Sequence, residues 1–423
     1  MPDLARRAEL NPRVPLGAMI VSSVVSTLGG RVSMVAIPWL VLTTTHSPEQ
    51  MGLVIVGSTV PYLLSSAFGA PITDRLGLRT AVVGADLFSA LTTAVIAATP
   101  NVGVGVIIAM SALAGVVRGS ADRSKHVILR PVAEAAGARM IRITAVYDGL
   151  ANGATLVGAP LAGLLVQWAG AQGAIWVDAS TFVVSAALVA FLVRLPPGQE
   201  WERKPKPEPY LTALRGGARQ LVRDRLLLGM IVMTFFANVV NQAHTALFVP
   251  LWVAEVLHSP AALGTVLGAF AAGALLGNVL FTAVAPKLPQ YLTFTVCIML
   301  SGTPRILVLA MTRDLVLVLT VTFVCGLAVA GVNPILGVML YERVPSALQN
   351  RVFGLVATVS FAGYPVGGLL AGWAITGFGL TTAILLGAAI YVIATGLPLL
   401  RYRQAAESGD GAEVYTMDGP ANR

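Results

Sequence analysis

The chain has 423 residues, of which 56% are hydrophobic and 11% are charged, and its formal net charge is +8. A soluble globular protein carries about 25% charged residues, so this composition excludes a soluble globule and places the chain in a lipid bilayer. The positive charges lie mainly in loops between apolar segments, where they track membrane orientation, so they do not indicate a nucleic-acid partner. Both cysteines, Cys297 and Cys325, lie in apolar segments and indicate neither a disulfide nor a metal site.

Apolar runs of about 20 residues, each long enough to cross a bilayer as a helix, follow one another along the chain. We therefore predict an all-α membrane protein with twelve transmembrane helices in two pseudo-symmetric six-helix bundles. The first six are expected at residues 16–44, 49–73, 80–99, 103–129, 143–169 and 172–194. The second six are expected at residues 226–257, 261–284, 290–312, 314–341, 350–376 and 379–401.

A polar segment between residues 195 and 225 separates the two halves. It holds eleven charged residues with a positive balance, and proline and glycine interrupt its first half. Short loops rich in Lys and Arg stay on the cytoplasmic side, so we predict a cytoplasmic linker. The predicted domains are a first six-helix bundle at 1–195, a central loop at 196–224, a second bundle at 225–402 and a disordered cytoplasmic tail at 403–423.

The distribution of basic residues predicts the orientation. Cytoplasmic segments would hold 22 of the 28 Lys and Arg residues, the external loops only Arg313, and the remaining five fall within spans. This asymmetry predicts a multi-pass protein of the inner (plasma) membrane with both termini in the cytoplasm. The first apolar run is longer than that of a cleavable signal peptide, so we expect the N-terminal segment to be a retained tail.

The two halves share an internal sequence repeat. AIPWLVLTTTHSPEQMGLV around Pro38 aligns without gaps to FVPLWVAEVLHSPAALGTV around Pro250, 212 residues later. LVGAPLAGLL around Pro160 is echoed by FAGYPVGGLL around Pro365, 205 residues later. Two matches in the same order and in equivalent spans indicate a duplicated six-helix unit with parallel topology, an arrangement found in certain transporters.

Several motifs resemble those of the major facilitator superfamily, over nearly the whole chain apart from its two tails. APITDRLGLRT after the second span is similar to the loop motif of that family, although Ala70 and Leu78 depart from it. Residues 158–163 (GAPLAG) are similar to the glycine and proline motif of its exporters, and Arg118 occupies the place of the arginine of the fourth-span motif. WVDASTFVVSA and RVFGL most resemble the branch with enterobactin and macrolide exporters.

The loop motif also has a physical interpretation. Asp74, Arg75 and Arg79 would lie at the cytoplasmic mouth, where a carboxylate pairs with arginines or faces the positive end of a helix in one gate state only. Asp86, about two turns into the third span, could join this gating network. The alternative is that these residues are ordinary interfacial charges that enforce orientation.

The resemblance implies that the first, fourth, seventh and tenth helices line a central cavity. Polar side chains in a span are costly and usually face such a cavity, so Arg31 and Arg118 are candidate substrate-binding residues. For Arg118 the alternative is a structural ion pair with Asp122 or Asp148. Lys125 and His126 lie further along the fourth span and are expected at its solvated end.

The seventh span adds candidate substrate-binding amides at Asn238, Asn241 and Gln242, with His244 beside them. The alternative is that these amides hydrogen-bond between helices. The candidate lining helices carry more basic than acidic residues. This balance favours anionic, zwitterionic or neutral amphiphiles and disfavours simple cations.

Proton coupling requires a protonatable group inside the membrane. The intramembrane candidates are Asp122, Asp148 and Asp178, and Asp122 is preferred because it shares a helical face with Arg118. A static salt bridge between Asp122 and Arg118 would leave the same sequence pattern.

Together, these features predict a proton-coupled exporter, an antiporter of a small organic molecule such as an antibiotic, siderophore or secondary metabolite, working by alternating access. One alternative is an uptake carrier for an anionic nutrient, and another is a membrane sensor that transports nothing. No phosphate-binding loop, metal-spaced His or Cys cluster or nucleophile elbow occurs in the sequence. We therefore expect no enzyme activity, cofactor or metal, and a monomer whose partners are the substrate, protons and membrane lipid.

Overall fold

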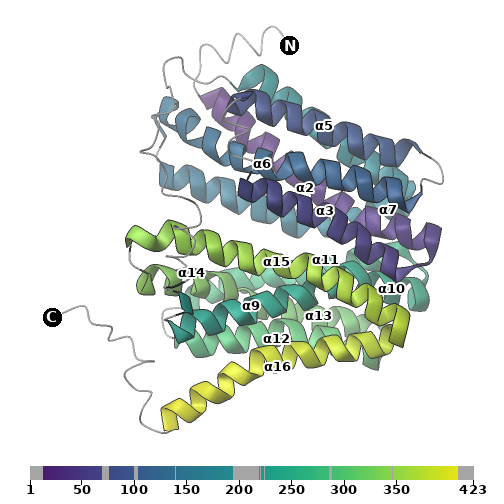
Figure 1. Ribbon diagram of the computed structural model, residues 1–423, viewed down its shortest axis with the longest axis vertical. Coiled ribbons are helices and arrows are strands. Elements are labelled where there is room, and N and C mark those ends of the chain that lie inside the picture. Colours follow the sequence, from purple (N-terminus) through teal and green to yellow (C-terminus); the bar gives the residue numbers. More distant parts are fainter. Residues whose placement is uncertain are drawn as a thin grey trace, which may run out of the picture. The chain divides into compact units, whose positions relative to one another are not determined.

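A computed structural model describes most of the chain, and all regular elements of the described residues are helices (Figure 1). The described residues are 13–68, 76–99, 103–138, 140–193, 219, 221–222, 224–284, 288–344 and 346–407. Most of the predicted central loop and C-terminal tail, together with Asp74 and Arg75, lies outside them.

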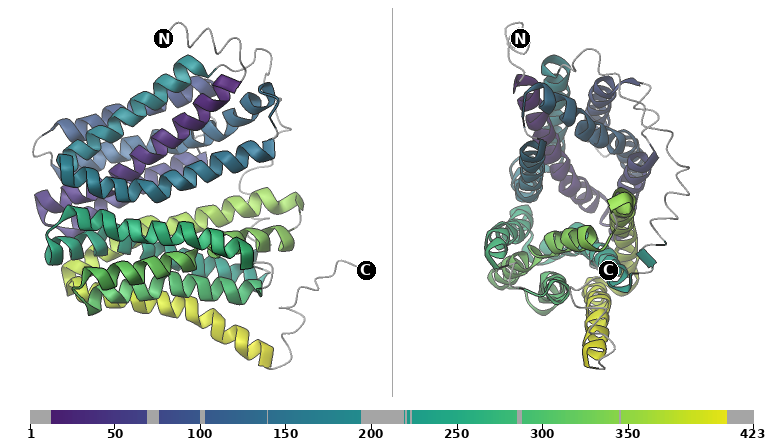
Figure 2. Two further views of the ribbon diagram at one scale, coloured as in Figure 1. Left: turned by 180° about the vertical axis from the view of Figure 1, so that it is seen from behind. Right: turned by 90° about the vertical axis from the view of Figure 1, so that its left-hand side faces the viewer.

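The first half of the chain forms long helices that run side by side (Figures 1 and 2). Their bounds are α2 Arg13–Thr45, α3 Pro48–Phe68, α5 Leu78–Ala98, α6 Val104–Ala135 and α7 Met140–Leu192. The helix α7 is interrupted at Gly170, where φ is 72° and ψ is 172°. Only glycine adopts this conformation readily, so the break divides α7 into the predicted fifth and sixth spans.

The second half begins with one long helix that contains two π-helical turns. Its parts are α9 Arg225–Ala243, η1 His244–Phe248, α10 Val249–Trp252 and η2 Val253–Leu257. The later helices are α11 Pro260–Val284, α12 Gln290–Met311, α13 Leu315–Val329, α14 Val332–Arg343, α15 Ser346–Phe378 and α16 Leu380–Glu407.

The predicted fold class is confirmed. Ten helical stretches of the described residues are long and apolar enough to cross a membrane, and Pro160–Leu192 is counted as one of them. With α7 divided at Gly170 and α3 included, the helices correspond to the twelve predicted spans. The predicted span 226–257 coincides with the stretch Leu226–Leu257.

The repeated sequence motif has a repeated backbone conformation. His46 and His258 are the only residues other than glycine that have a positive φ in the described part of the chain, at 54° and 51°. Each is followed by Ser-Pro, and the prolines Pro48 and Pro260 begin α3 and α11. Proline suits the first position of a helix because its missing N–H has no partner there in any case. The repeat thus encodes the same turn twice.

The described residues cluster into two compact units. The larger contains the described parts of Met1–Pro207, Gln242–Ala271 and Tyr364–Ala383, and the smaller contains those of Glu208–Asn241, Ala272–Gly363 and Ile384–Arg423. The predicted domain boundaries at 195 and 225 remain predictions.

Two glycines bring α6 against α3 in the larger unit. A Cβ atom on Gly115 would lie 2.5 Å from the carbonyl oxygen of Ser58, and one on Gly119 would collide with the carbonyl oxygen of Tyr62. The helices can approach this closely only because both side chains are absent. This approach places the α6 residues around Gly119 beside Tyr62.

An apolar cluster closes one end of the first-half bundle, where α2, α5, α6 and α7 pack together. Its fully or almost fully buried members include Met19, Val82, Ile128, Val132 and Val189. The polar residues described next lie beyond this cluster, in the interior of the same bundle.

Candidate functional site

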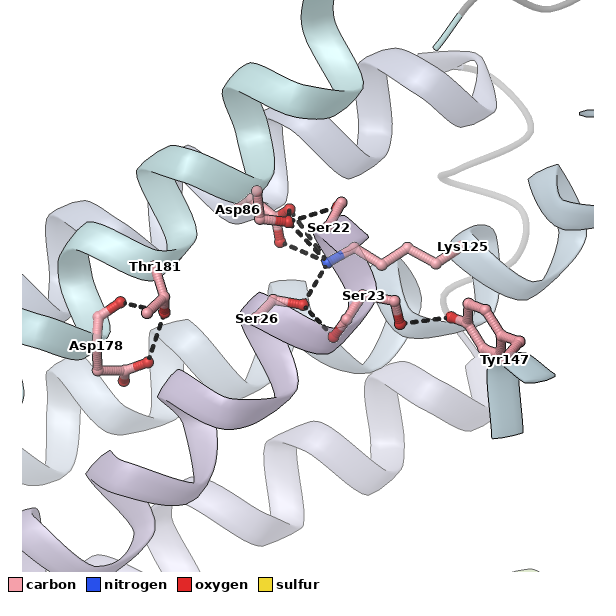
Figure 3. A network of polar contacts seen from close by, with 9 residues as sticks. Ser22, Ser23, Ser26, Asp86, Lys125, Tyr147, Asp178 and Thr181 are labelled. Atoms are coloured by element: carbon pink, nitrogen blue, oxygen red, sulfur yellow. Dashed lines mark hydrogen bonds and ion pairs between the residues drawn. The ribbon is translucent and has the colours of Figure 1, made fainter. Parts of the chain in front are cut away.

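A buried ion pair joins four helices of the first half (Figure 3). Lys125 of α6 lies 3.1 Å from a carboxylate oxygen of Asp86 on α5, and the two side chains are 2% and 4% exposed. The ammonium also donates to the hydroxyls of Ser26 on α2, at 2.9 Å, and Ser185 on α7, at 3.3 Å. Ser185 in turn donates to Asp86 at 2.6 Å. Every N–H of the ammonium can therefore reach an acceptor.

The prediction that Lys125 lies at the solvated end of its helix is wrong. The predicted span ended at residue 129, whereas α6 continues to Ala135, so Lys125 is further from the end of the helix than expected. Its side chain extends into the bundle because Asp86 and two hydroxyls compensate for the loss of water. His126, the next residue, is exposed as expected.

A second buried acid, Asp178 of α7, has a different environment (Figure 3). It is 0% exposed. Ser33 of α2 donates to one of its oxygens. The hydroxyl of Thr181 on α7 donates to the backbone carbonyl of Asp178 at 2.7 Å, and its oxygen lies 3.4 Å from the other carboxyl oxygen, from which it can accept a hydrogen bond. Among the described residues, no lysine, arginine or histidine forms an ion pair with Asp178. This carboxyl group therefore has hydroxyl partners but no cation within ion-pair distance among the described residues.

Arg118 of α6 is half-buried and lies over an aromatic ring. Its guanidinium carbon is 4.8 Å from the centroid of the Phe182 ring on α7, a favourable position for a cation. The expected alternative, an ion pair with Asp122, is not formed among the described residues. Asp122 instead accepts a hydrogen bond from Tyr62 at 3.1 Å. Among the described residues Arg118 makes no ion pair. The side chain of Asp148 is outside the described set.

Arg31 of α2 is also half-buried and has no acidic partner among the described residues. Its guanidinium lies 3.5 Å from the sulfur of Met34. Gly158 of α7 provides room for its side chain, because a Cβ there would lie 2.6 Å from Cβ of Arg31. The larger unit thus holds two arginines whose hydrogen-bonding capacity is largely unused by described residues.

The predicted gating residues are not all described. Asp74 and Arg75 lie outside the described residues. Arg79 of α5 donates to the backbone carbonyls of Val189, at 3.4 Å, and Ala190, near the end of α7. Asp86 pairs with Lys125. In this conformation Arg79 therefore contacts the end of α7 by donating hydrogen bonds to backbone carbonyl oxygens. The gating role of these residues stays a prediction.

The seventh-span amides divide between two kinds of environment. Asn238 donates to the backbone carbonyl of Ser360 on α15 at 2.9 Å, and Asn241 accepts a hydrogen bond from Arg305 on α12. These contacts correspond to the helix-to-helix alternative. Gln242 and His244 are buried, and His244 begins the π-helical turn η1. Such turns occur frequently at functional sites.

Sequence alone did not indicate the ion pair of Lys125 with Asp86 or the hydrogen bond from Arg305 to Asn241. Lys125 and Arg305 are basic and lie within apolar helices, and each is 5% exposed or less. The signal for Lys125 was the set of serines on the neighbouring helices, at positions 22, 26 and 185, which contribute hydroxyls to one network. Their convergence depends on helix packing, which sequence spacing alone does not specify.

The comparisons with known proteins agree with this architecture. The multidrug efflux pump Tap of Mycobacterium tuberculosis is 28% identical over 408 residues, covering 92% of this chain and 93% of Tap. Tap of Mycolicibacterium fortuitum is 25% identical over 366 residues, covering 85% and 89%. The crystal structure of the nucleoside transporter NupG matches with a TM-score of 0.73 at 12% identity, covering 91% of this chain and 98% of NupG, and this likeness concerns the fold alone.

The profile described as Major Facilitator Superfamily matches residues 19–247 and 231–414. These matches cover most of the chain and include both halves of the internal repeat. They agree with the all-helical fold and with the motifs quoted from the sequence. The chain belongs to the major facilitator superfamily.

Proposed function

We propose that this protein is a proton-coupled exporter, an antiporter that moves a small organic molecule out of the cell by alternating access. The observation that carries the proposal is Arg118, a half-buried guanidinium inside a helical bundle with no acidic partner among the described residues. A cation placed in an apolar span is costly and usually serves a pathway or a ligand. Similarity to a multidrug efflux pump along nearly the whole chain supports outward transport.

Arg31 and Arg118 support a particular substrate class. Both carry a fixed positive charge, and their N–H groups are donors only. They favour molecules that present acceptor oxygens, and they repel simple cations. Gln242 and His244 add buried polar groups on the seventh helix. We therefore propose an anionic, zwitterionic or neutral amphiphile, such as an antibiotic, siderophore or secondary metabolite, as the substrate.

Orientation and coupling complete the proposal. The excess of Lys and Arg in alternate loops supports a multi-pass protein of the plasma membrane with both termini in the cytoplasm. Asp74, Arg75, Arg79 and Asp86 remain the proposed gating residues. Asp122 and Asp148 are the acids that the sequence suggests for proton coupling. We propose that the protein works as a monomer in contact with membrane lipid.

A susceptibility panel tests the proposal. Cells that express the protein are compared with cells that carry an empty vector, and the panel includes the neutral antibiotic chloramphenicol. Export predicts a raised inhibitory concentration that Arg118→Ala abolishes. Arg130→Ala is the matched control, because Arg130 lies on the same helix but is exposed, and its ion-pair partner among the described residues is Glu134 at 2.9 Å. Equal susceptibility of both cell types to every compound would oppose export and favour the sensor alternative.

One observation also favours a second candidate, uptake of an anionic nutrient. Arg31 and Arg118 lack acidic partners among the described residues, and a substrate anion would supply one. Accumulation of a permanently charged aromatic sulfonate such as toluenesulfonate by intact cells would support uptake. Efflux of a neutral compound from the same cells would support export.

A further inference from the structure

We propose that Asp178 is a proton-binding site of this carrier, and that Arg118 is the cation that pairs with its carboxylate when the proton leaves. The proposal rests on the transport function proposed above and adds a residue that the sequence analysis did not choose for coupling. It also assigns two positions to Arg118, one for each protonation state of Asp178.

Two buried acids in one bundle have contrasting surroundings. Asp86 and Asp178 are both buried, but Asp86 has Lys125 at 3.1 Å, whereas the carboxyl contacts of Asp178 among the described residues are the hydroxyls of Ser33 and Thr181. Burying an ionised carboxylate without a cation costs far more than burying a neutral acid, so such a group takes up a proton. In the arrangement described, Asp178 is therefore the neutral member of the pair of acids and Asp86 the ionised one.

Among the residues that the structure describes, the helices packed against α7 leave one cation available to pair with Asp178. Helix α5 presents Asp86, which bonds to Ser185 two turns along α7. It also presents Arg79, which is occupied by the backbone carbonyls of Val189 and Ala190 further along α7. Helix α6 presents Lys125, which is occupied by Asp86, and Arg118, which is not paired among the described residues. Helix α2 presents Arg31, whose side chain packs at Gly158, in the part of α7 before the break at Gly170, whereas Asp178 lies after that break. Arg118 is thus the candidate partner.

Two consecutive glycines of α2 bring Asp178 and Arg118 to the same turn. A Cβ on Gly29 would collide with a carboxyl oxygen of Asp178 and with the hydroxyl of Thr181, and a Cβ on Gly30 would collide with a terminal nitrogen of Arg118. The carboxyl group and the guanidinium therefore lie against neighbouring residues of one helix. A shift of the guanidinium away from the Phe182 ring, four residues from Asp178 on α7, is the movement that would join them.

The two protonation states give Arg118 two roles. With Asp178 protonated, the guanidinium rests on Phe182, as in the structure. When the proton leaves, Asp178 holds one edge of the guanidinium, and the other edge can donate to an acceptor oxygen on a neutral substrate, since arginine has five donors in a rigid fork. Proton and neutral substrate then oppose each other's binding, and thermodynamic linkage makes this effect reciprocal. That is the relation an antiporter requires.

Infrared spectroscopy of the purified protein in lipid tests the proton directly, without a substrate. The spectrum of the wild type at neutral pH, minus that of Asp178→Asn, should contain a band of a protonated carboxylic acid. Glu134→Gln, which removes an exposed carboxylate paired with Arg130, should remove no such band.

The amide introduced by Asp178→Asn can bond to the same two hydroxyls, so we expect the variant to fold. A Ser33→Ala variant should shift the acid band without removing it. A difference spectrum without the acid band would overturn the proposal.

Chloramphenicol binding tests the coupling. The compound is neutral at the relevant pH values, so any pH dependence belongs to the protein. The affinity of the wild type should fall on the order of tenfold as the pH is lowered through the titration of Asp178. Asp178→Asn should give a flat profile, and Glu134→Gln, which removes an exposed carboxylate, should keep the slope. An Asp178→Asn variant with the wild-type slope would contradict the inference. Failure of the wild type to bind chloramphenicol would count against the proposed substrate class, while the infrared result would still decide the protonation of Asp178.

Discussion

Lys125 and Asp86 form an ion pair at 3.1 Å in the interior of the first-half bundle, where hydroxyls from α2 and α7 complete the shell around both charges. A buried pair of this kind contributes little net stability, but loss of one partner leaves a buried charge without compensation. Asp86→Asn should therefore destabilise the protein by about 3–5 kcal/mol, which thermal unfolding in detergent would show.

The double variant Asp86→Leu with Lys125→Met is the control for that prediction. It removes both charges together, so its unfolding temperature should lie closer to the wild type than that of Asp86→Asn alone. If the single and double variants were equally unstable, the ion pair would not be the cause of the loss.

We expect an alanine substitution to have different consequences at Gly29 and at Gly30. Gly29→Ala would place its Cβ against the side-chain oxygen and Cβ of Thr181 and against Asp178, which are held by the bundle, so we expect lower stability and yield. Gly30→Ala would meet the flexible end of Arg118, which can move away. This variant should fold normally but lose export, as Arg118→Ala does. Size-exclusion profiles and efflux measured on both variants test the distinction, and a Gly30→Ala variant with full export would contradict the assigned position of Arg118.

His46 and His258 both have a left-handed backbone conformation, so the same substitutions at the two positions test the repeated turn. Their φ values of 54° and 51° disfavour β-branched side chains. His46→Val should cost about 1–2 kcal/mol of unfolding free energy, whereas His46→Gly should cost little, because glycine adopts this conformation without strain. The same pair of substitutions at position 258 should behave alike. Equal effects of valine and glycine would show that the histidine side chain, and not the backbone, matters at the turn.

Gly170 separates the fifth and sixth spans through a backbone conformation that is nearly exclusive to glycine, with φ 72° and ψ 172°. Gly170→Ala should lower the free energy of unfolding by about 1–3 kcal/mol, because alanine adopts this backbone conformation only with strain. Gly153→Ala, in the helical part of α7 before the break, is the matched control, because a Cβ there would meet nothing within 4 Å. Thermal unfolding of both variants measures the difference, and a harmless Gly170→Ala would contradict the strained break.

Much of the fold could be predicted from the sequence because lipid imposes simple rules. A helix that crosses a bilayer needs a long apolar run, and the runs gave spans such as 226–257 almost without error. The turn at His46-Ser47-Pro48 was visible as a repeat before its conformation was known. The break inside α7 was harder to place, because one glycine in an otherwise apolar stretch makes the connection between its two helices.

The site could be predicted only in part, because the partners of a buried charge come from other helices. Arg118 was recognised as a buried cation from its own helix, but its contact with Phe182 depends on the packing of α6 against α7. The position of Lys125 along its own helix predicts a solvent-exposed side chain. In the structure the side chain is buried in the bundle, where serines of α2 and α7 accept hydrogen bonds from its ammonium group. Asp122 was preferred to Asp178 for sharing a face with Arg118, yet it is Tyr62 that bonds to Asp122.

The most direct test of the account is the flux of chloramphenicol into inside-out membrane vesicles that contain the protein. Acidification of the vesicle interior should drive accumulation of this neutral compound in vesicles with the wild type and with Arg130→Ala, and dissipation of the pH gradient should release it. Vesicles with Arg118→Ala should accumulate no more than vesicles without the protein. Equal accumulation with Arg118→Ala and the wild type would contradict the role of Arg118, and accumulation driven by the opposite gradient would contradict export.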